Sequence, residues 1–174
     1  LLPVAGQPLL AHLLDRLRPQ AARIVLSANG DPARFAAFSL PVVADAVEDA
    51  GPLAGIAAAA GYSAAVWPEA GRLVTIPVDT PCPPADLVAR LTAAPEGLVA
   101  VAEAGGRLHW GTACWPLAAA LRLDAAVREG GLRRLEAAVR SEGLAPVPFP
   151  DPDAFTNVNT PETLESVTRL LTSP

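Results

Sequence analysis

The stretch that decides the fold reads RLVTIPVDTP and covers residues 72–81. Its first seven residues form an apolar, partly β-branched run, which is typical of a buried strand. The run predicts a strand over Arg72–Val78, and Asp79 follows it directly, before a Thr-Pro pair. Because proline lacks the backbone N–H that strand pairing needs, Asp79 is expected at the carboxyl end of this strand.

Helices and strands alternate on both sides of this stretch. Apolar residues at helical spacing predict a helix over Leu9–Leu17, and a β-branched run predicts a strand over Arg23–Ser27. The other expected elements are, in order, a short helix over Ala33–Phe38, a strand over Pro41–Ala44, a helix over Leu53–Tyr62 ended by Gly61, a helix over Asp86–Leu91, strands over Val99–Ala102 and Leu108–Ala113, helices over Leu117–Val127 and Leu132–Val139, a strand over Pro146–Phe149 and a helix over Pro161–Leu171. This alternation predicts an α/β fold with a mostly parallel sheet and helices on both faces.

Length and charge limit the possible classes of protein. A chain of 174 residues fits one domain with a single core, and 51% hydrophobic against 18% charged residues exclude a disordered chain. The 13 basic residues, all arginine, are outnumbered by 18 acidic ones, so we expect no broad basic face for nucleic acid or membrane. The acidic composition is still compatible with a small anionic ligand, because backbone amides, a few arginines and a metal ion can neutralise phosphates locally.

The environment of the protein can also be predicted. Cys82 and Cys114 stand far apart without metal-ligand spacing, and no apolar run reaches transmembrane length or resembles a signal peptide. These features predict a reduced, soluble, cytoplasmic protein. Residue 1 is leucine rather than methionine, so we also expect the natural chain to start further upstream.

Ligands of parallel α/β sheets bind outside the carboxyl ends of the strands, so polar residues there are candidates for a site. These candidates are Ser27, Asn29, Asp45 and Asp79, joined from later irregular segments by His109, Asn157 and Asn159. At Asp79 a strand end would hold a carboxylate rigidly, as a magnesium ligand requires. The alternative is that Asp79 only caps a helix starting near Pro83.

The remaining candidates also have two interpretations each. Asn157 and Asn159 share one side of an extended segment and suit a phosphate or a metal, but Asn159 or Thr160 could instead cap the last helix. The small residues of Gly51–Gly55 allow close approach of a ligand to a helix N-terminus, or simply close packing on the sheet. His109 could bind substrate or be a partly buried structural histidine.

The order of these motifs resembles the molybdenum cofactor guanylyltransferase family. The resemblance starts with LPVAGQPLL at residues 2–10 and continues with Ser27-Ala28-Asn29 and Asp45. It then includes GPLAG at residues 51–55, DTP at residues 79–81 and NVNTP at residues 157–161, so it spans essentially the whole chain. Each motif alone is weak, but their combination and order are specific.

The resemblance implies a single three-layer, Rossmann-like nucleotidyltransferase domain over residues 1–174. In such a domain Ser27, Asn29, Asp45 and Gly51 would lie at the guanine nucleotide. Asp79 would be the catalytic residue that binds Mg²⁺ and the nucleotide phosphates. Residues toward the pterin would be His109, Asn157 and Asn159, with Asn159 also near the metal.

The implied reaction transfers GMP from GTP to molybdopterin and releases pyrophosphate, with transient contact to molybdoenzymes as a possible further step. Two departures from the family pattern bear on this. The family opens with a strand and a glycine-rich phosphate loop that this sequence lacks, and Trp110 follows His109 where the family has proline. Alternatives are therefore a cytidylyl- or sugar-phosphate nucleotidyltransferase of the same fold, or a non-catalytic relative that binds the pterin or a partner.

Overall fold

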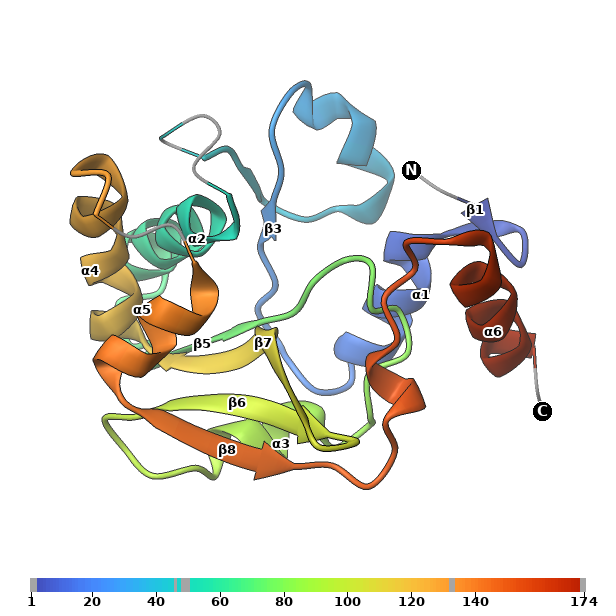
Figure 1. Cartoon of the computed structure of the whole chain (residues 1–174). Helices are drawn as coiled ribbons and strands as arrows, with labels where there is room; N and C mark the ends of the chain where they lie inside the picture. Colours follow the sequence, from blue (N-terminus) through green and yellow to red (C-terminus); the bar gives the residue numbers. More distant parts are fainter. Residues whose placement is uncertain (1–2, 46, 48–50, 132–133, 173–174) are drawn as a thin grey trace.

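The computed structural model describes residues 3–45, 47, 51–131 and 134–172, and its centre is a four-stranded sheet (Figure 1). The strand order is β5 (Arg72–Thr75), β7 (Arg107–Pro116), β6 (Val99–Ala104) and β8 (Leu144–Pro148). β7 is antiparallel to both β5 and β6, and β6 is parallel to β8. Three of these strands therefore share one direction and β7 is reversed, which agrees with a mostly parallel sheet.

β6 shows why helices are needed on both faces. Val99 and Val101 pack with Trp115 in one buried cluster, and the alternating Ala100 and Ala102 pack in another. Helices α2 (Pro52–Val66), α4 (Leu117–Arg128) and α5 (Leu135–Glu142) supply the first cluster, and α3 (Leu87–Thr92) supplies the second. Because both faces are covered, residues 99–102 of the strand are apolar without alternation.

A second, smaller pair of strands lies apart from this sheet. β3 (Leu26–Ser27) and β4 (Val42–Val43) are parallel, and between them runs the 3-10 helix η1 (Pro32–Phe38). Leu26 packs with Leu10 and Leu14 of α1 (Leu9–Leu17) in a core of their own. Two separately packed strand groups thus make up the α/β body.

The two ends of the described chain meet in a third small core. An antiparallel hairpin, β1 (Pro3–Val4) and β2 (Gln7–Pro8), lies next to the C-terminal helix α6 (Pro161–Thr172), which follows a short 3-10 helix, η2 (Asp153–Phe155) (Figure 1). Val4 is buried there together with Val158 and Val167. This core anchors the segment that contains the asparagine pair.

Most expected elements are confirmed, and the differences have local causes. Helix α1 has the predicted bounds, and the β6–β7 hairpin turns at Gly105 and Gly106 as expected. The helix predicted to end at Gly61 continues to Val66, so that boundary was wrong. Burial of Ser63 beyond the glycine gives the helix a packing partner, which outweighs the roughly 1 kcal/mol cost of a helical glycine.

Other boundaries also shift. β5 ends at Thr75 instead of Val78, because Pro77 cannot donate to the ladder, and β3 begins at Leu26 instead of Arg23. Helix α5 begins at Leu135, whereas the prediction started at Leu132; residues 132–133 lie outside the described residues. The hairpin of β1 and β2 was not predicted from the residue pattern.

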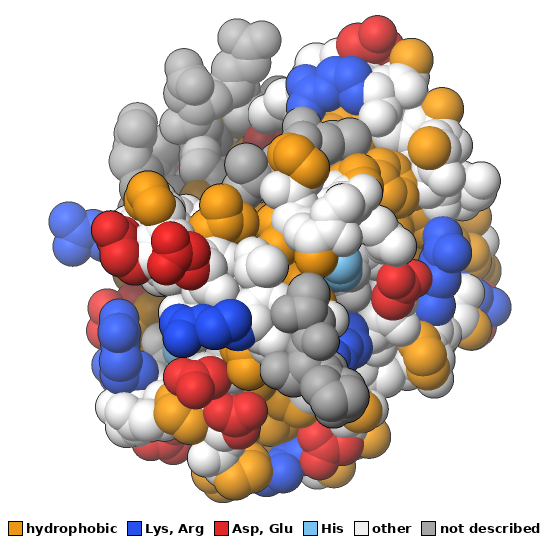
Figure 2. Space-filling model, turned by 90° about the vertical axis from the view of Figure 1, so that its right-hand side faces the viewer, with side chains coloured by type: hydrophobic (Ala, Val, Ile, Leu, Met, Phe, Trp, Pro, Cys, Tyr) orange, Lys and Arg blue, Asp and Glu red, His pale blue; other side chains and the backbone are white. Residues whose placement is uncertain are grey.

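Charges of both signs lie interspersed on the surface. On the face seen in Figure 2, acidic and basic side chains alternate with apolar ones. Three arginines form ion pairs with an acidic residue four positions earlier: Arg90 with Asp86, Arg128 with Asp124 and Arg140 with Glu136. Across the described ranges, no helix is both long and apolar enough to cross a membrane.

The core predicts the effect of a leucine truncation. Leu91 of α3 is fully buried, so Leu91→Ala should lower the free energy of unfolding by about 2–5 kcal/mol, the usual cost of a cavity. Leu121 of α4 is exposed, and Leu121→Ala should stay within about 0.5 kcal/mol of the parent. Urea unfolding measures both, and equal effects would contradict the described core.

Candidate functional site

A cavity of about 1220 Å³ lies between β3 and β5, where the two strand groups face each other. Most of the residues predicted for the site line it, at the carboxyl ends of the strands. They are Ser27, Asn29, Asp45, Gly51, Asp79 and Asn157. The structure therefore brings together residues that lie up to 130 positions apart in the sequence. Among the described residues that line the cavity, His109 and Asn159 do not occur.

Asp45 is the centre of a polar network on one side of the cavity. Its Oδ1 accepts from the Ser27 hydroxyl at 3.2 Å, and its Oδ2 accepts from Asn29 Nδ2 at 3.0 Å. The Asp45 backbone N–H donates back to Asn29 Oδ1 at 2.9 Å. A carboxylate has about four acceptor positions, so Asp45 keeps capacity for a ligand that donates hydrogen bonds.

Helix α2 begins directly below this network. Gly51 precedes its first residue with a φ of 68°, a conformation that glycine adopts without strain. One turn later, a Cβ on Gly55 would lie 2.7 Å from Ser27 Oγ and 3.4 Å from Asp45 Oδ1. The small residue at position 55 thus lets the helix approach the polar side chains. This close approach explains why the GPLAG motif ends in glycine.

Asp79 faces the same cavity from the end of the β5 segment. Among the described residues, its buried Oδ1 atom has no hydrogen-bond partner. The alternative helix-cap role is wrong, because α3 begins at Leu87 and Asp86 holds its N-cap position. A buried carboxylate oxygen without a partner is costly, so it indicates a missing cation or donor.

Val158 ties the asparagine segment to Asp79. Its backbone N–H donates to the Asp79 carbonyl oxygen at 2.8 Å, and its side chain is buried in the small core of the chain ends. Asn157 lines the cavity and Asn159 does not, and both residues are exposed. The predicted cap is confirmed for Thr160, whose Oγ1 accepts from the Thr163 N–H at 3.3 Å while its own N–H donates to Thr163 Oγ1.

His109 lies on β7 in an aromatic environment. Its ring stacks on Phe155 with 4.6 Å between centroids, and its Nε2 atom is buried without a partner among the described residues. Burial lowers the pKa of His109, and the nearby Arg107 charge lowers it further, against an opposing hydrogen bond with the Ala104 backbone. The neighbouring Trp110 packs under the Arg140 guanidinium of α5, 5.4 Å from its ring centroid.

The donor set at the cavity fits one kind of metal ion. Within the described ranges, no three His, Cys, Asp or Glu side chains converge into a metal-binding group. Asp79 offers a carboxylate, and Asn157 can offer a carbonyl oxygen on the same cavity. Mg²⁺ is typically held by one or two carboxylates together with substrate phosphates and water, so this arrangement suits Mg²⁺ bound with a nucleotide.

Comparisons with known proteins identify the family. The sequence model described as the MobA-like NTP transferase domain matches residues 1–143. A molybdenum cofactor guanylyltransferase of Cereibacter sphaeroides is 46% identical over 170 residues, which are 98% of this chain and 86% of that relative. The chain belongs to the MobA-like NTP transferase family. A relative of the same name from Rhodopseudomonas palustris is 41% identical and matches 96% of this chain and 82% of its own length.

Solved structures show the same NTP transferase fold. The molybdopterin-guanine dinucleotide biosynthesis protein A of Archaeoglobus fulgidus superposes with a TM-score of 0.73 at 19% identity, over 98% of this chain and 88% of its own. A 2-C-methyl-D-erythritol 4-phosphate cytidylyltransferase from Thermus thermophilus reaches 0.67 at 18% identity, over 98% and 92%. The three-layer fold predicted from the motifs is therefore confirmed.

Two features of this NTP transferase domain were not predicted. A Cβ on Gly111 would lie 2.6 Å from Pro77 Cγ, so this glycine allows β7 to pass the proline that ends β5. A glycine within an expected strand does signal close approach of another segment, which could have found it. The hydrogen bond of Val158 to Asp79 has no such signal, because it joins backbone atoms of distant segments.

Alanine substitutions at two glycines of α2 are expected to change the free energy of unfolding in opposite directions. Gly55→Ala should lower the free energy of unfolding by about 1–3 kcal/mol, because the new methyl group clashes with Ser27 and Asp45. Gly61→Ala in the same helix meets nothing within 4 Å and should raise it by about 0.5–1 kcal/mol. Urea unfolding of both variants checks the contact, and stabilisation by Gly55→Ala would show it to be absent.

The partly buried imidazole of His109 predicts a pH effect. The pKa of His109 is lower in the folded chain, so the unfolded state binds a proton first as the pH falls. Stability should be unaffected above about pH 6.5 and should be lost progressively below it. His109→Phe should remove this part of the pH dependence, which urea unfolding between pH 5 and 8 would reveal. A pH profile that the variant leaves unchanged would assign the effect elsewhere.

Proposed function

We propose that this chain transfers GMP from GTP to the terminal phosphate of molybdopterin and releases pyrophosphate. The observation that carries the proposal is the convergence of Asp79 and the Asp45 network on one cavity. The chain's sequence identity of 40–46% with relatives named molybdenum cofactor guanylyltransferase supports the choice of substrates. The proposed setting is the cytoplasm, with transient contact to molybdoenzymes that receive the product.

The proposed nucleotide side of the cavity is formed by β3, β4 and the start of α2. Ser27, Asn29 and Asp45 would contact the guanine nucleotide, and their mutual hydrogen bonds fix the Asp45 carboxylate before the ligand arrives. Gly51 would allow close approach at the helix N-terminus, where backbone amides favour anions. A preformed network reduces the ordering cost of binding.

The proposed phosphate side is formed by Asp79 and its neighbours. Asp79 would hold Mg²⁺, which when bound neutralises phosphate charge and orients the α-phosphate. The bond to Val158 fixes the Asp79 backbone, so the carboxylate is aimed by two segments. This rigidity is what a positioned reaction centre requires.

The proposed reaction needs no protein nucleophile. An oxygen of the acceptor phosphate attacks the α-phosphorus in line, the bond between the α-phosphorus and its bridging oxygen to the β-phosphate breaks, and pyrophosphate leaves with the electron pair. In such phosphoryl-type transfers the protein contributes positioning and charge neutralisation. The absence of a serine or cysteine nucleophile motif from the sequence is consistent with this chemistry.

The acceptor would bind beside the asparagine segment. Asn157 lines the cavity and would donate to the acceptor phosphate through its amide. Contacts of the pterin with Asn159 and His109 require the acceptor to extend beyond the cavity, toward η2, where His109 stacks on Phe155. A role of Asn159 as a second metal ligand likewise requires bound groups that extend beyond the cavity.

Nucleotide titration tests the proposal. The polypeptide expressed from its natural start codon is titrated with GTP, CTP and ATP by calorimetry, with and without Mg²⁺. We expect Mg²⁺-dependent binding of GTP. In a turnover assay of pyrophosphate release, Asp79→Ala should lower kcat about 100-fold or more, because a preorganised charge at the reaction centre is lost. Asp15→Ala, on the exposed face of α1, is the matched control and should bind GTP like the parent.

The other outcomes select between the alternatives. Preference for CTP would overturn the guanylyl assignment in favour of a cytidylyltransferase, a chemistry found on this fold in the Thermus thermophilus neighbour. A folded protein that binds none of the three nucleotides would overturn catalysis and indicate a domain that binds the pterin or a partner.

A further inference from the structure

Asp79 lies on a tight turn that follows β5. Val78 and Asp79 are the two central residues of this turn. The turn is closed by the Thr80 N–H, which donates to the Pro77 carbonyl oxygen at 3.1 Å. Because the outer residues of a four-residue turn fix the path of the central two, the direction of the Asp79 carboxylate depends on where Pro77 and Thr80 lie.

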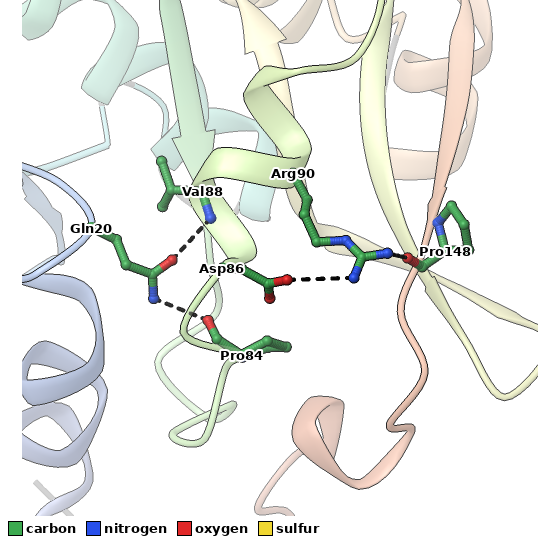
Figure 3. Close-up of polar contacts among 6 residues, drawn as sticks. All are labelled: Gln20, Pro84, Asp86, Val88, Arg90 and Pro148. Carbon is green, nitrogen blue, oxygen red and sulfur yellow. Dashed lines mark hydrogen bonds and ion pairs between the residues drawn. The ribbon is translucent and has the colours of Figure 1, made fainter.

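The segment that follows this turn is held in place along its length. The side chains of Pro81 and Pro83 are fully buried. Gln20, from the segment after α1, donates through its Nε2 to the Pro84 carbonyl oxygen at 3.0 Å and accepts through its Oε1 from the Val88 N–H at 3.0 Å (Figure 3). A displacement of the turn consequently cannot be absorbed on this side.

Helix α3, which ends this segment, is itself attached to the central sheet. Arg90 of the helix pairs with Asp86 at 3.4 Å and donates to the carbonyl oxygen of Pro148, the last residue of β8 (Figure 3). Its guanidinium also lies 4.5 Å from the ring centroid of Phe149. The segment between Asp79 and α3 therefore ends on a fixed support.

On its other side, the turn packs against an irregular part of β7. Val101 of β6 pairs with Ala113 of β7. The next residue of β6, Ala102, pairs with His109, which lies four positions earlier in β7. Within this described ladder, residues 110–112 are therefore left without a partner on β6. Bulges of this kind bend a strand and occur often beside active sites, where they redirect a side chain.

Gly111 is the middle residue of this bulge and faces Pro77. The described ladder of β5 and β7 ends at Thr75 and Ala113, and two residues further on the same register places Pro77 opposite Gly111. Thr75 Oγ1 donates to the Gly111 carbonyl oxygen at 3.0 Å, which holds the bulge against β5. The bulge thus meets the chain at the residue with which the Asp79 turn begins.

This contact leaves no room for a side chain at position 111. A Cβ on Gly111 would lie 2.6 Å from Pro77 Cγ and 3.4 Å from Pro77 Cδ. The φ of Gly111 lies outside the left-handed region, so its backbone is open to alanine and the proline ring alone opposes a methyl group. A proline ring is closed onto its own backbone and cannot swing aside as a flexible side chain would.

Both neighbours of Gly111 anchor the bulge. Trp110 packs against the core cluster that α2, α4 and α5 supply, and the Arg140 guanidinium lies 5.4 Å from its ring centroid. Thr112, on the other side, is buried. Because the bulge is anchored in this way, a clash at position 111 would displace the Pro77 ring and the turn that begins there.

We propose that Gly111 is a positioning residue for Asp79 and acts through Pro77. The proline ring rests on the bare backbone of the glycine, and the turn thereby presents the Asp79 carboxylate to the cavity. This role rests on the proposed function, in which Asp79 holds Mg²⁺ and a misplacement of about 1 Å can cost about 100-fold in rate.

Two substitutions and their combination test this role in the polypeptide used for nucleotide titration. Gly111→Ala introduces the clash, and Pro77→Ala removes the ring that the turn rests on. In the double variant the two Cβ atoms would lie 4.0 Å apart, an ordinary contact, so the turn should return toward its parent position. Gly71→Ala, whose methyl group meets nothing within 4 Å before β5, is the matched control and should behave like the parent.

Amide hydrogen exchange, without nucleotide or metal, measures the turn itself. The Thr80 and Val158 amides both donate to carbonyl oxygens of the turn. They should exchange about tenfold faster in each single variant, because local opening becomes easier, and near the parent rate in the double variant. The Leu117 amide, at the far end of β5 and β7, should keep its rate, whereas equal acceleration there would reveal a general loss of stability and overturn the positioning role.

Calorimetric titration with GTP measures what the turn does for the metal. The ratio of the Kd without Mg²⁺ to the Kd with Mg²⁺ should fall about tenfold in each single variant and recover in the double variant, because metal and nucleotide binding are coupled through Asp79. The Kd without Mg²⁺ should stay at its parent value. In a turnover assay, kcat should fall more than KM rises, a split that a general structural defect would not produce.

Failure of the positioning role can be told apart from failure of the proposed function. A parent without Mg²⁺-dependent GTP binding would overturn the proposed function, while the exchange experiment would still decide whether Gly111 fixes the turn. Unchanged exchange at Thr80 and Val158 in Gly111→Ala would overturn the positioning role. If Gly111→Ala does not fold, a double variant whose Thr80 exchanges as fast as in Pro77→Ala would overturn it, and slower exchange would support it.

Discussion

The close contact of Gly55 with Ser27 and Asp45 is the constraint on which the candidate site depends. Ser27 ends β3, Gly55 lies in α2, and Asp45 follows two residues after β4. With any larger residue at position 55, the helix would have to move away from the strand ends. The Asp45 carboxylate would then lose the geometry that its bonds to Ser27 and Asn29 define. The packing of the helix and the geometry of the candidate site are therefore set by the same glycine.

The site is assembled from two halves that are packed independently. Asp45 belongs to the group of β3 and β4, while Asp79 follows β5 and is held by Val158 from the C-terminal segment. In the described residues the two halves are joined by Gln20, and also by α2, which packs in the core of the central sheet and contacts β3 and β4. The relative position of the two carboxylates therefore depends on these connections.

Much of the fold could be predicted from the sequence, because its signals are local. The period of α1, the apolar run before Asp79 and the double glycine between β6 and β7 each specify their element within ten residues or so. The site residues could be grouped because strands of one direction end at one edge. The end of α2 was mispredicted at Gly61, since tertiary packing of Ser63 decides it. The Val158 bond to Asp79 could not be predicted, because backbone pairing across 79 positions leaves no residue pattern.

The charges around the cavity explain why a cation belongs to the proposed chemistry. The arginines that line the cavity are Arg23 and Arg72, and both already have partners: Arg23 pairs with Glu69, and Arg72 donates to the Ala94 carbonyl oxygen at 3.3 Å. Arg23 precedes β3 and Arg72 is the first residue of β5, so both lie at the amino ends of these strands, away from Asp79. A triphosphate beside the Asp79 carboxylate would be repelled by like charge unless a cation lies between them. The Asp79 carboxylate therefore weakens nucleotide binding when no cation is present and strengthens it once a divalent cation is bound. Metal and nucleotide should consequently bind cooperatively.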